Sequence, residues 1–136
     1  MTPVFGRDDL VAKWVGANLG QVIVPPFVAI GFTEDGTSLC GGAVFNEWNG
    51  SNVEVTIYGP GALRRSAIQT VLRYAFRQIK ANRLTARTKR SNRVMRRLLP
   101  RLGFRFECSM KHYYGPSRGE DALMFVLLPA DAGKWI

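Results

Sequence analysis

The stretch VEVTIYGPGALRRSAIQTVLRYAF, residues 53–76, decides how the rest of the chain is interpreted. It starts with alternating β-branched and polar residues, which are typical of a strand, and passes through a loop with two glycines and a proline. From Ile68 onward, apolar residues recur at the spacing of a helix that buries one face. A strand, a glycine loop and a helix in this order can hold a phosphate group, because the free amides of the first helical turn point outwards.

Arg64 and Arg65 stand where this helix is expected to begin. The start of a helix carries the positive end of its dipole, so two cations there are unfavourable unless an anion lies opposite them. A bound phosphate would be such an anion. The local pattern alone also fits an ordinary Gly-Pro-Gly turn.

The flanking sequence predicts the other elements. Upstream we expect a helix over Asp8–Asn18 with Asp8 as its cap, followed by a meander of strands at Phe27–Phe32, Leu39–Phe45 and Val53–Tyr58. Downstream we expect the helix Ala67–Lys80, a strand in RLTART, a helix from the cap Ser91 to Gly103, and strands at Phe104–Tyr114 and Ala122–Leu128. The order predicts one α/β (α+β) domain over residues 1–136, with a mixed, mostly antiparallel sheet of six to seven strands flanked by helices.

The charge is concentrated in one part of the chain. The formal net charge is +9, most of the 19 Lys and Arg residues lie between Arg64 and Arg105, and no acidic residue occurs between Glu54 and Glu107. One interpretation is a solvated helical face. The other is a surface for phosphates, in a nucleic acid or a nucleotide cofactor.

Cysteines and apolar runs exclude several classes of protein. Cys40 and Cys108 have neither the number nor the spacing of a disulfide framework or a zinc site. We expect reduced core thiols in strands, the alternative being a nucleophilic cysteine paired with His112, the only histidine. The longest apolar run, Val22–Phe32, is interrupted by two prolines, and no signal-peptide layout opens the chain. These features predict a soluble cytoplasmic protein without a metal site or a membrane partner.

Residues 53–76, together with RLTART, SNRVMRRLLPRLGFRFE and the final DALMFVLL, resemble the GNAT (GCN5-related) N-acetyltransferase family over about Phe27 to Leu128. Ribosomal-protein-type and small phage-encoded members are the most similar. The resemblance implies an enzyme that moves an acetyl group from acetyl-CoA to an amine of a small molecule or protein. It also implies that the N-terminal part is shortened, because relatives usually place two helices between the first two strands.

The resemblance implies a cofactor site between two splayed strands. Backbone amides at Thr56, Ile57 and Tyr58 would face acetyl-CoA, and its pyrophosphate would rest on the start of the next helix, at Arg64, Arg65 and Ser66. The family's paired loop glycines are absent, since Ala62, Leu63 and Arg64 occupy those positions. Two guanidinium groups can offset the lost backbone fit by pairing directly with phosphate.

Asn92 matches the asparagine that helps to anchor the pantetheine arm in the family, and its alternative role is that of a polar group in the first turn of a helix. Many relatives carry a tyrosine seven residues later, as the acid that protonates the thiolate. Leu99 occupies that position here.

Glu54 is the only acid in its strand, and relatives often use a glutamate there as the base for the amine proton. Its alternative role is a solvent-facing strand residue. His112, Tyr113 and Tyr114 are expected on a late strand that reaches the same cleft, where the histidine or a tyrosine could deliver the other proton.

A second hypothesis is a catalytically inactive module with the same fold that binds nucleic acid through its basic residues 64–105. The missing glycines and tyrosine favour it, whereas the complete order of elements and Asn92 favour the enzyme. The shortened N-terminal part would leave the acceptor groove open or completed by a second subunit. Trp14, Trp48 and Trp135 are candidate exposed anchors for such a homodimer.

Overall fold

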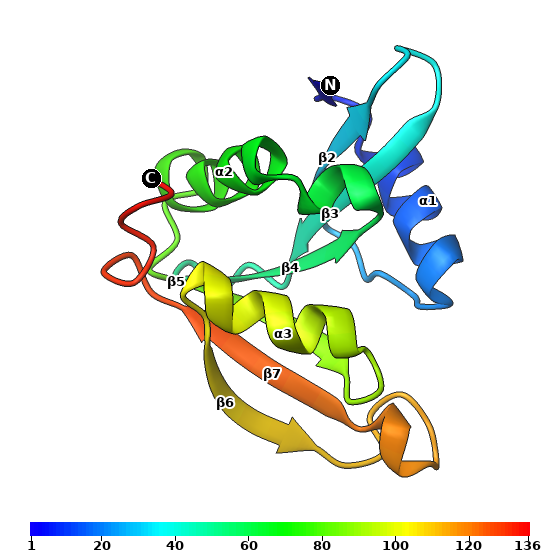
Figure 1. Ribbon diagram of the computed structural model, residues 1–136, viewed down its shortest axis with the longest axis vertical. Helices are drawn as coiled ribbons and strands as arrows, with labels where there is room; N and C mark the ends of the chain where they lie inside the picture. The colour runs from blue at the N-terminus through cyan, green and yellow to red at the C-terminus, as the bar shows by residue number, and fades with distance from the viewer.

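A seven-stranded sheet runs through the computed structural model, which describes residues 1–136, with the strand order β1-β2-β3-β4-β5-β7-β6 (Figure 1). The strands are β1 (Thr2–Val4), β2 (Val28–Thr33), β3 (Leu39–Asn46), β4 (Asn52–Tyr58), β5 (Arg83–Lys89), β6 (Arg105–Met110) and β7 (Ala122–Leu127). All neighbouring strands are antiparallel except β4 and β5, which are parallel. The predicted mixed, mostly antiparallel sheet is confirmed.

Helices cover both faces of this sheet (Figure 1). They are α1 (Asp8–Leu19), the 3-10 turn η1 (Pro60–Leu63), α2 (Arg65–Arg73), which continues as the π-helical turn η2 (Tyr74–Gln78), α3 (Arg93–Leu102) and the 3-10 turn η3 (Arg118–Glu120). A single helix, α1, connects β1 to β2, in agreement with the predicted short N-terminal part. None of these helices has both the length and the apolar character needed to cross a membrane.

Alternation along the strands creates a separate apolar cluster on each face. On one face, Val11 and Val15 of α1 pack with Ala29 and Val44. On the other face, α2 and α3 pack with the alternate residues of the same strands, such as Phe45, in a larger cluster. The sheet is therefore the middle layer of the protein, with α1 on one side and α2 and α3 on the other.

The parallel pairing between β4 and β5 is short. It covers only Asn52 with Arg83, Val53 with Leu84, and Glu54 with Thr85. Beyond this point β4 stays paired with β3 as far as Tyr58, and β5 stays paired with β7 as far as Lys89. The two strands consequently diverge in the middle of the sheet, and the gap lies between their C-terminal halves.

Several predicted boundaries are wrong at helix starts. Asn92 caps α3, with its side chain accepting a hydrogen bond from the Met95 amide at 3.2 Å, so Ser91 lies one residue before the cap. Asp8 lies in the first turn of α1, after the cap position, and its carboxylate accepts the Ala29 amide at 2.9 Å. The helix predicted over Ala67–Lys80 begins earlier, at Arg65.

The ends of the sheet also differ from expectation. The short strand β1 pairs with β2, although its three residues carry no clear alternation. The strand predicted to reach Tyr114 ends at Met110, because the chain turns away after it. Cys108 lies on β6, the edge of the sheet, and is exposed, so it is not the core thiol that was expected, whereas Cys40 is half-buried.

Glycines in the loop after β4 serve close packing against β3. Gly59 has a φ of 95°, which favours glycine, and a Cβ atom there would lie 2.6 Å from the Cys40 carbonyl oxygen. A Cβ atom at Gly61 would collide with Sγ of Cys40, and one at Gly41 would collide with the backbone nitrogen of Ala62. The loop therefore packs closely against β3, and this contact fixes the position at which α2 begins.

The variant Gly41→Ala tests this contact. We expect it to lower the free energy of unfolding by about 1–3 kcal/mol, because the added methyl group forces β3 and the loop apart. Gly133→Ala is the matched control, since nothing lies within 4 Å of a Cβ atom there. Urea denaturation measures both, and equal stability of the two variants would contradict the close packing.

Candidate active site

The gap between β4 and β5 holds a pocket, and two further pockets adjoin it; we call the three together the channel. The central, narrow part has a volume of about 70 Å³ and is lined by residues of both strands, of α3, of the end of α1 and of the segment after it. A polar cleft of about 320 Å³ lies at one end and shares Gln21, Thr56 and Arg87 with this part. A more apolar opening of about 310 Å³ lies at the other end, beside η1 and α3, and shares Ile57 and Asn92.

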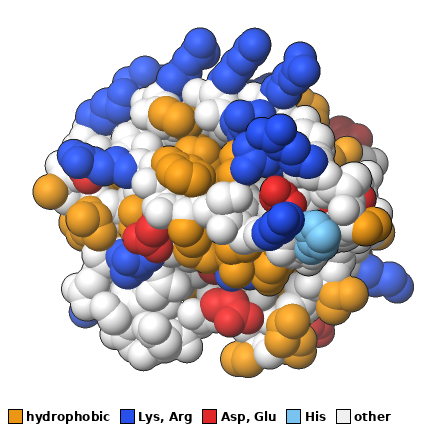
Figure 2. All heavy atoms as spheres, turned by 90° about the horizontal axis from the view of Figure 1, so that it is seen from below, with side chains coloured by type: hydrophobic (Ala, Val, Ile, Leu, Met, Phe, Trp, Pro, Cys, Tyr) orange, Lys and Arg blue, Asp and Glu red, His pale blue; other side chains and the backbone are white.

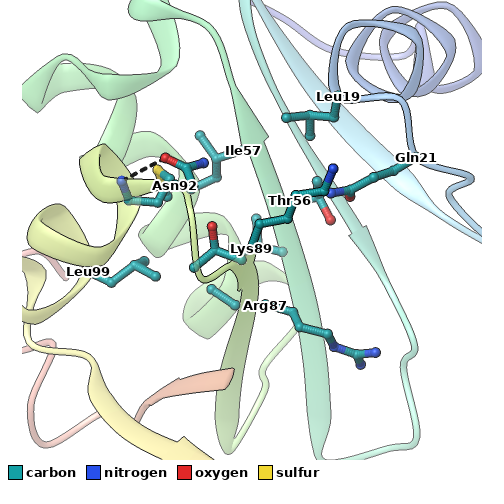
Figure 3. A pocket seen from close by; sticks show the side chains of 12 residues that line it. Leu19, Gln21, Thr56, Ile57, Arg87, Lys89, Asn92 and Leu99 are labelled. Carbon is teal, nitrogen blue, oxygen red and sulfur yellow. Dashed lines mark hydrogen bonds between the residues drawn. The ribbon is translucent and has the colours of Figure 1, made fainter. Parts of the chain in front are cut away.

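Figure 3 shows how side chains from distant parts of the sequence meet at the narrow part. Asn92 and Leu99 approach from α3, and Ile57 and Thr56 from β4. Lys89 extends from β5 towards Gln21 on the far side of the gap. The side chains of Lys89 and Gln21 therefore border the narrow part from opposite sides of the gap.

Backbone groups of β4 border the gap. Between Val55 and Tyr58 the strand has β3 as a neighbour on one side, but the β4–β5 ladder has already ended on the other side. Amides and carbonyls that face the gap lack the strand partner that a continuous sheet would provide. Thr56, Ile57 and Tyr58, which the resemblance places beside a cofactor, lie in this segment.

Glu54 and Arg87 form an ion pair where the polar cleft meets the channel. The guanidinium Nη2 lies 2.6 Å from Oε1 of Glu54, and the two side chains are only 15% and 13% exposed. Arg87 also donates a hydrogen bond to the Tyr113 hydroxyl and lies over its ring, 4.6 Å from the centroid. Glu54 is thus a largely buried residue of the cleft and not a solvent-facing one.

Burial raises the pKa of Glu54 above its ordinary value of 4.5, and the charge and hydrogen bond of Arg87 oppose this shift without cancelling it. Burial also raises the pKa of Tyr114 to about 12, so its hydroxyl stays protonated at neutral pH. The cleft therefore holds a carboxylate that accepts a proton more readily than a solvated glutamate does.

The tyrosines reach the cleft from a turn. Tyr113 and Tyr114 follow the end of β6, line the cleft, and contact each other edge to face, with centroids 4.9 Å apart. His112 lies in the same turn with a φ of 60°, is exposed, and does not line the cleft. The prediction of a strand at these residues is wrong, and the turn brings in the two tyrosines without the histidine.

Asn92 lies at the junction of the channel and its apolar opening. Its Oδ1 caps α3, so only the Nδ2 group remains to donate a hydrogen bond into the channel. Leu99, at the position where relatives carry the acidic tyrosine, is fully buried in the channel wall.

The two arginines at the start of α2 have partners within the protein. Arg64 forms an ion pair with Glu34 of the β2–β3 hairpin. The guanidinium of Arg65 lies over the Trp135 ring, 5.4 Å from its centroid. No side chain caps α2, so the amides of its first turn, including that of Ser66, remain free.

Several cleft residues were not predicted from the sequence. Gln21 comes from the segment after α1, and Asn46 lies directly opposite Glu54 in the β3–β4 register. Asn46 is buried, its Nδ2 donates to the Val24 carbonyl at 3.1 Å, and its Oδ1 accepts no hydrogen bond. The polar residue Asn46 at the end of an apolar strand was the one available signal. Its place beside Glu54 follows only from the register of β3 against β4, which the sequence does not give.

The aromatic residues proposed as anchors differ in exposure. Trp135 is buried and donates to the Leu102 carbonyl at 3.0 Å, and Trp14 packs edge to face on Tyr58. These two belong to the internal packing, whereas Trp48 is 48% exposed. No group of three or more His, Cys, Asp or Glu side chains is placed to hold a metal ion.

The raised pKa of Glu54 predicts a pH-dependent stability difference. An ionised Glu54 is disfavoured in the fold, so the wild-type protein should lose stability relative to Glu54→Gln as pH rises above about 4.5 through the raised pKa. Below this window the difference should be constant. Urea denaturation between pH 4 and pH 8 measures it, with Glu107→Gln as a control for an exposed ion pair. A wild-type protein that gains stability relative to Glu54→Gln as pH rises through this window would contradict the raised pKa.

Solved structures share this architecture, although no protein-family model and no curated protein sequence matches the chain. A mutant form of the spermidine N-acetyltransferase SpeG from Vibrio cholerae superposes with a TM-score of 0.75 at 14% identity, over 100% of this chain and 98% of that one. A ribosomal-protein-S5-alanine acetyltransferase from Vibrio fischeri gives 0.64 at 16% identity, with 75% of this chain covering 61% of that one. A probable acetyltransferase gives 0.66 at 20% identity, over 88% and 67%. The chain therefore has the fold of the GNAT N-acetyltransferases.

Proposed function

We propose that the protein transfers an acetyl group from acetyl-CoA to an amine. The observation that carries this proposal is the channel between β4 and β5, with a polar cleft around Glu54 at one end and an opening beside η1 and α3 at the other. Such a channel lets two substrates approach the same point from opposite faces. Proximity of this kind is a large part of the catalysis of a two-substrate reaction.

Acetyl-CoA fits the residues on the α3 side. The β4 backbone at Thr56 and Ile57 offers unpaired groups to the pantetheine arm and the thioester oxygen, and Asn92 offers its Nδ2 group. The free amides at the start of α2 and the side chain of Arg65 are suited to the pyrophosphate. When bound, acetyl-CoA supplies an acetyl group activated as a thioester.

The loop at residues 59–63 differs from the glycine-rich loop that binds pyrophosphate in the family. Gly59 and Gly61 pack against β3, and η1 occupies the position of the usual glycine-rich turn. Arg64 is already neutralised by Glu34, which leaves Arg65 and the backbone amide of Ser66 as the main phosphate ligands. Arg65 is the first residue of α2, and its guanidinium lies over the Trp135 ring.

The amine acceptor is placed in the polar cleft. Asn46 and Glu54 lie opposite each other in the β3–β4 register, and both line this cleft. Glu54 takes the proton of the amine, directly or through a water molecule, as the nitrogen bonds to the acetyl carbon. The amides of Thr56 and Ile57 point to opposite edges of β4, and the one that faces the gap stabilises the charge that develops on the carbonyl oxygen.

The departing sulfur needs a proton donor, and Leu99 cannot provide one. Tyr113 accepts a hydrogen bond from Arg87, so its own hydroxyl hydrogen is free to be donated. Tyr114 stays protonated and adds a second donor in the cleft wall. His112 does not line the cleft, so it is not part of this proposal.

The acceptor is an amine of a small molecule or a protein. The structures with the same fold are named for spermidine and for an alanine of a ribosomal protein, so the fold accommodates both kinds. The polar cleft holds a single carboxylate, which is paired with Arg87. A panel of small amines and N-terminal peptides is the screen that identifies the acceptor.

Glu54→Gln tests the catalytic role. It keeps the size of the side chain but removes the basic site, so turnover should fall about a hundredfold or more, with the affinity for acetyl-CoA nearly unchanged. Steady-state rates with an acceptor from the panel measure the effect, and Glu107→Gln is the matched control. Wild-type turnover in Glu54→Gln at every pH would place the base elsewhere.

Arg65→Gln tests the cofactor site. We expect the affinity for CoA to fall about tenfold, roughly 1.4 kcal/mol, because a charge-assisted contact to phosphate is lost. Arg73→Gln removes the same charge from the other end of α2, where the helix terminus faces away from the channel opening, and should bind normally. Titration calorimetry with CoA compares them, and equal affinities would argue against Arg65 as a phosphate ligand.

A further inference from the structure

The two helices on one face of the sheet carry only positive charge. Neither α2 with η2 nor α3 contains an acidic residue. Six of their arginines are exposed and form no ion pair with a carboxylate: Arg73, Arg77, Arg93, Arg96, Arg97 and Arg101. We call this set the basic face. It differs from the paired arginines of the cleft and of the loop before α2.

Figure 2 views the protein from the β6 side and shows Lys and Arg side chains projecting in a row along the top margin. This margin corresponds to the side of the sheet that carries α2 and α3, which lies towards the viewer in Figure 1. The acidic side chains in the same view lie below the row. The charge is therefore separated in space as well as in sequence.

This arrangement costs stability in the free protein. Arg93, Arg97 and Arg101 follow each other at four-residue intervals, so they are neighbours on the helix surface and repel one another. Arg93 also occupies the first turn of α3, at the positive end of the helix dipole. A bound polyanion would convert both unfavourable contributions into favourable ones.

The chemistry of the basic face selects one kind of polyanion. All of its six cations are arginines, whose planar fork suits phosphate oxygens. Large apolar side chains are almost absent from it, since Val94 is the only strongly exposed one on these two helices. Protein interfaces are centred on buried apolar or aromatic anchors, and helices that lie on membranes insert an apolar face, so neither partner fits.

We propose that the basic face binds the phosphate backbone of a nucleic acid without sequence preference. The surface offers charge and arginine forks, but no aromatic side chain on which a base could stack. It is distinct from the acetyl-transfer channel, because Arg97 and Arg101 line neither the channel nor its two openings.

The experiment compares two variants that remove the same charge. Arg97→Gln with Arg101→Gln changes the basic face, and Arg7→Gln with Lys13→Gln changes the opposite side, at α1, where both residues are exposed and unpaired. Fluorescence anisotropy measures the affinity of each for a labelled DNA duplex and an RNA duplex over a series of salt concentrations. A third arm measures binding to phosphatidylserine vesicles.

We expect the α3 double variant to bind both duplexes at least fivefold more weakly, about 1 kcal/mol, and the α1 variant to resemble the wild type. A plot of log K against log salt concentration has a negative slope, and its magnitude should decrease by about 1 to 2 in the α3 variant, because up to two phosphate contacts are lost. Three outcomes would overturn the proposal: no duplex binding by the wild type, equal losses in both variants, or strong binding to vesicles with weak binding to duplexes.

Discussion

The parallel contact between β4 and β5 ends after Glu54 and Thr85, and the functional features of the protein depend on this early divergence. Two strands that continue in the same sheet normally stay paired, since unpaired backbone groups away from water are costly. Here each strand keeps its other neighbour, so the divergence leaves the sheet intact on both sides. The unpaired edge is available to a ligand, and α3 and the segment after α1 close the space around it.

The ion pair between Glu54 and Arg87 gives the polar end of the gap its chemical character. A buried ion pair adds little to stability, because the loss of hydration offsets the attraction. Its presence is better explained by what it does to the carboxylate. Burial makes Glu54 a stronger base, and Arg87 limits this effect and holds the side chain in place. Tyr113 is ordered by the same guanidinium, so one arginine from β5 orients groups from two other segments.

Local patterns were sufficient to predict most of the fold. The helical spacing after Ile68, the turn dipeptides Asp35-Gly36 and Asn49-Gly50 between the strands, and Gly103 after the last helix are local signals, and they predict the meander and the helices. Contacts distant in sequence were not predictable in this way. The role of Arg87 depends on a parallel register with β4, and Asn46 depends on the register of β3. The tyrosines were expected on a strand because nothing local marks the turn after Met110.

The position of the Glu54–Arg87 pair has a mechanical consequence. Glu54 is the last β4 residue paired with β5, and Arg87 lies two residues beyond its partner Thr85, so their ion pair ties the strands together just above the fork. A ligand that widens the gap between the strands therefore acts on this ion pair as well as on the last backbone pairing, Glu54 with Thr85. The separation of the two strands and the pKa of Glu54 are therefore coupled. A longer distance between Arg87 and Glu54 weakens the attraction that lowers this pKa, so the carboxylate takes up a proton more readily.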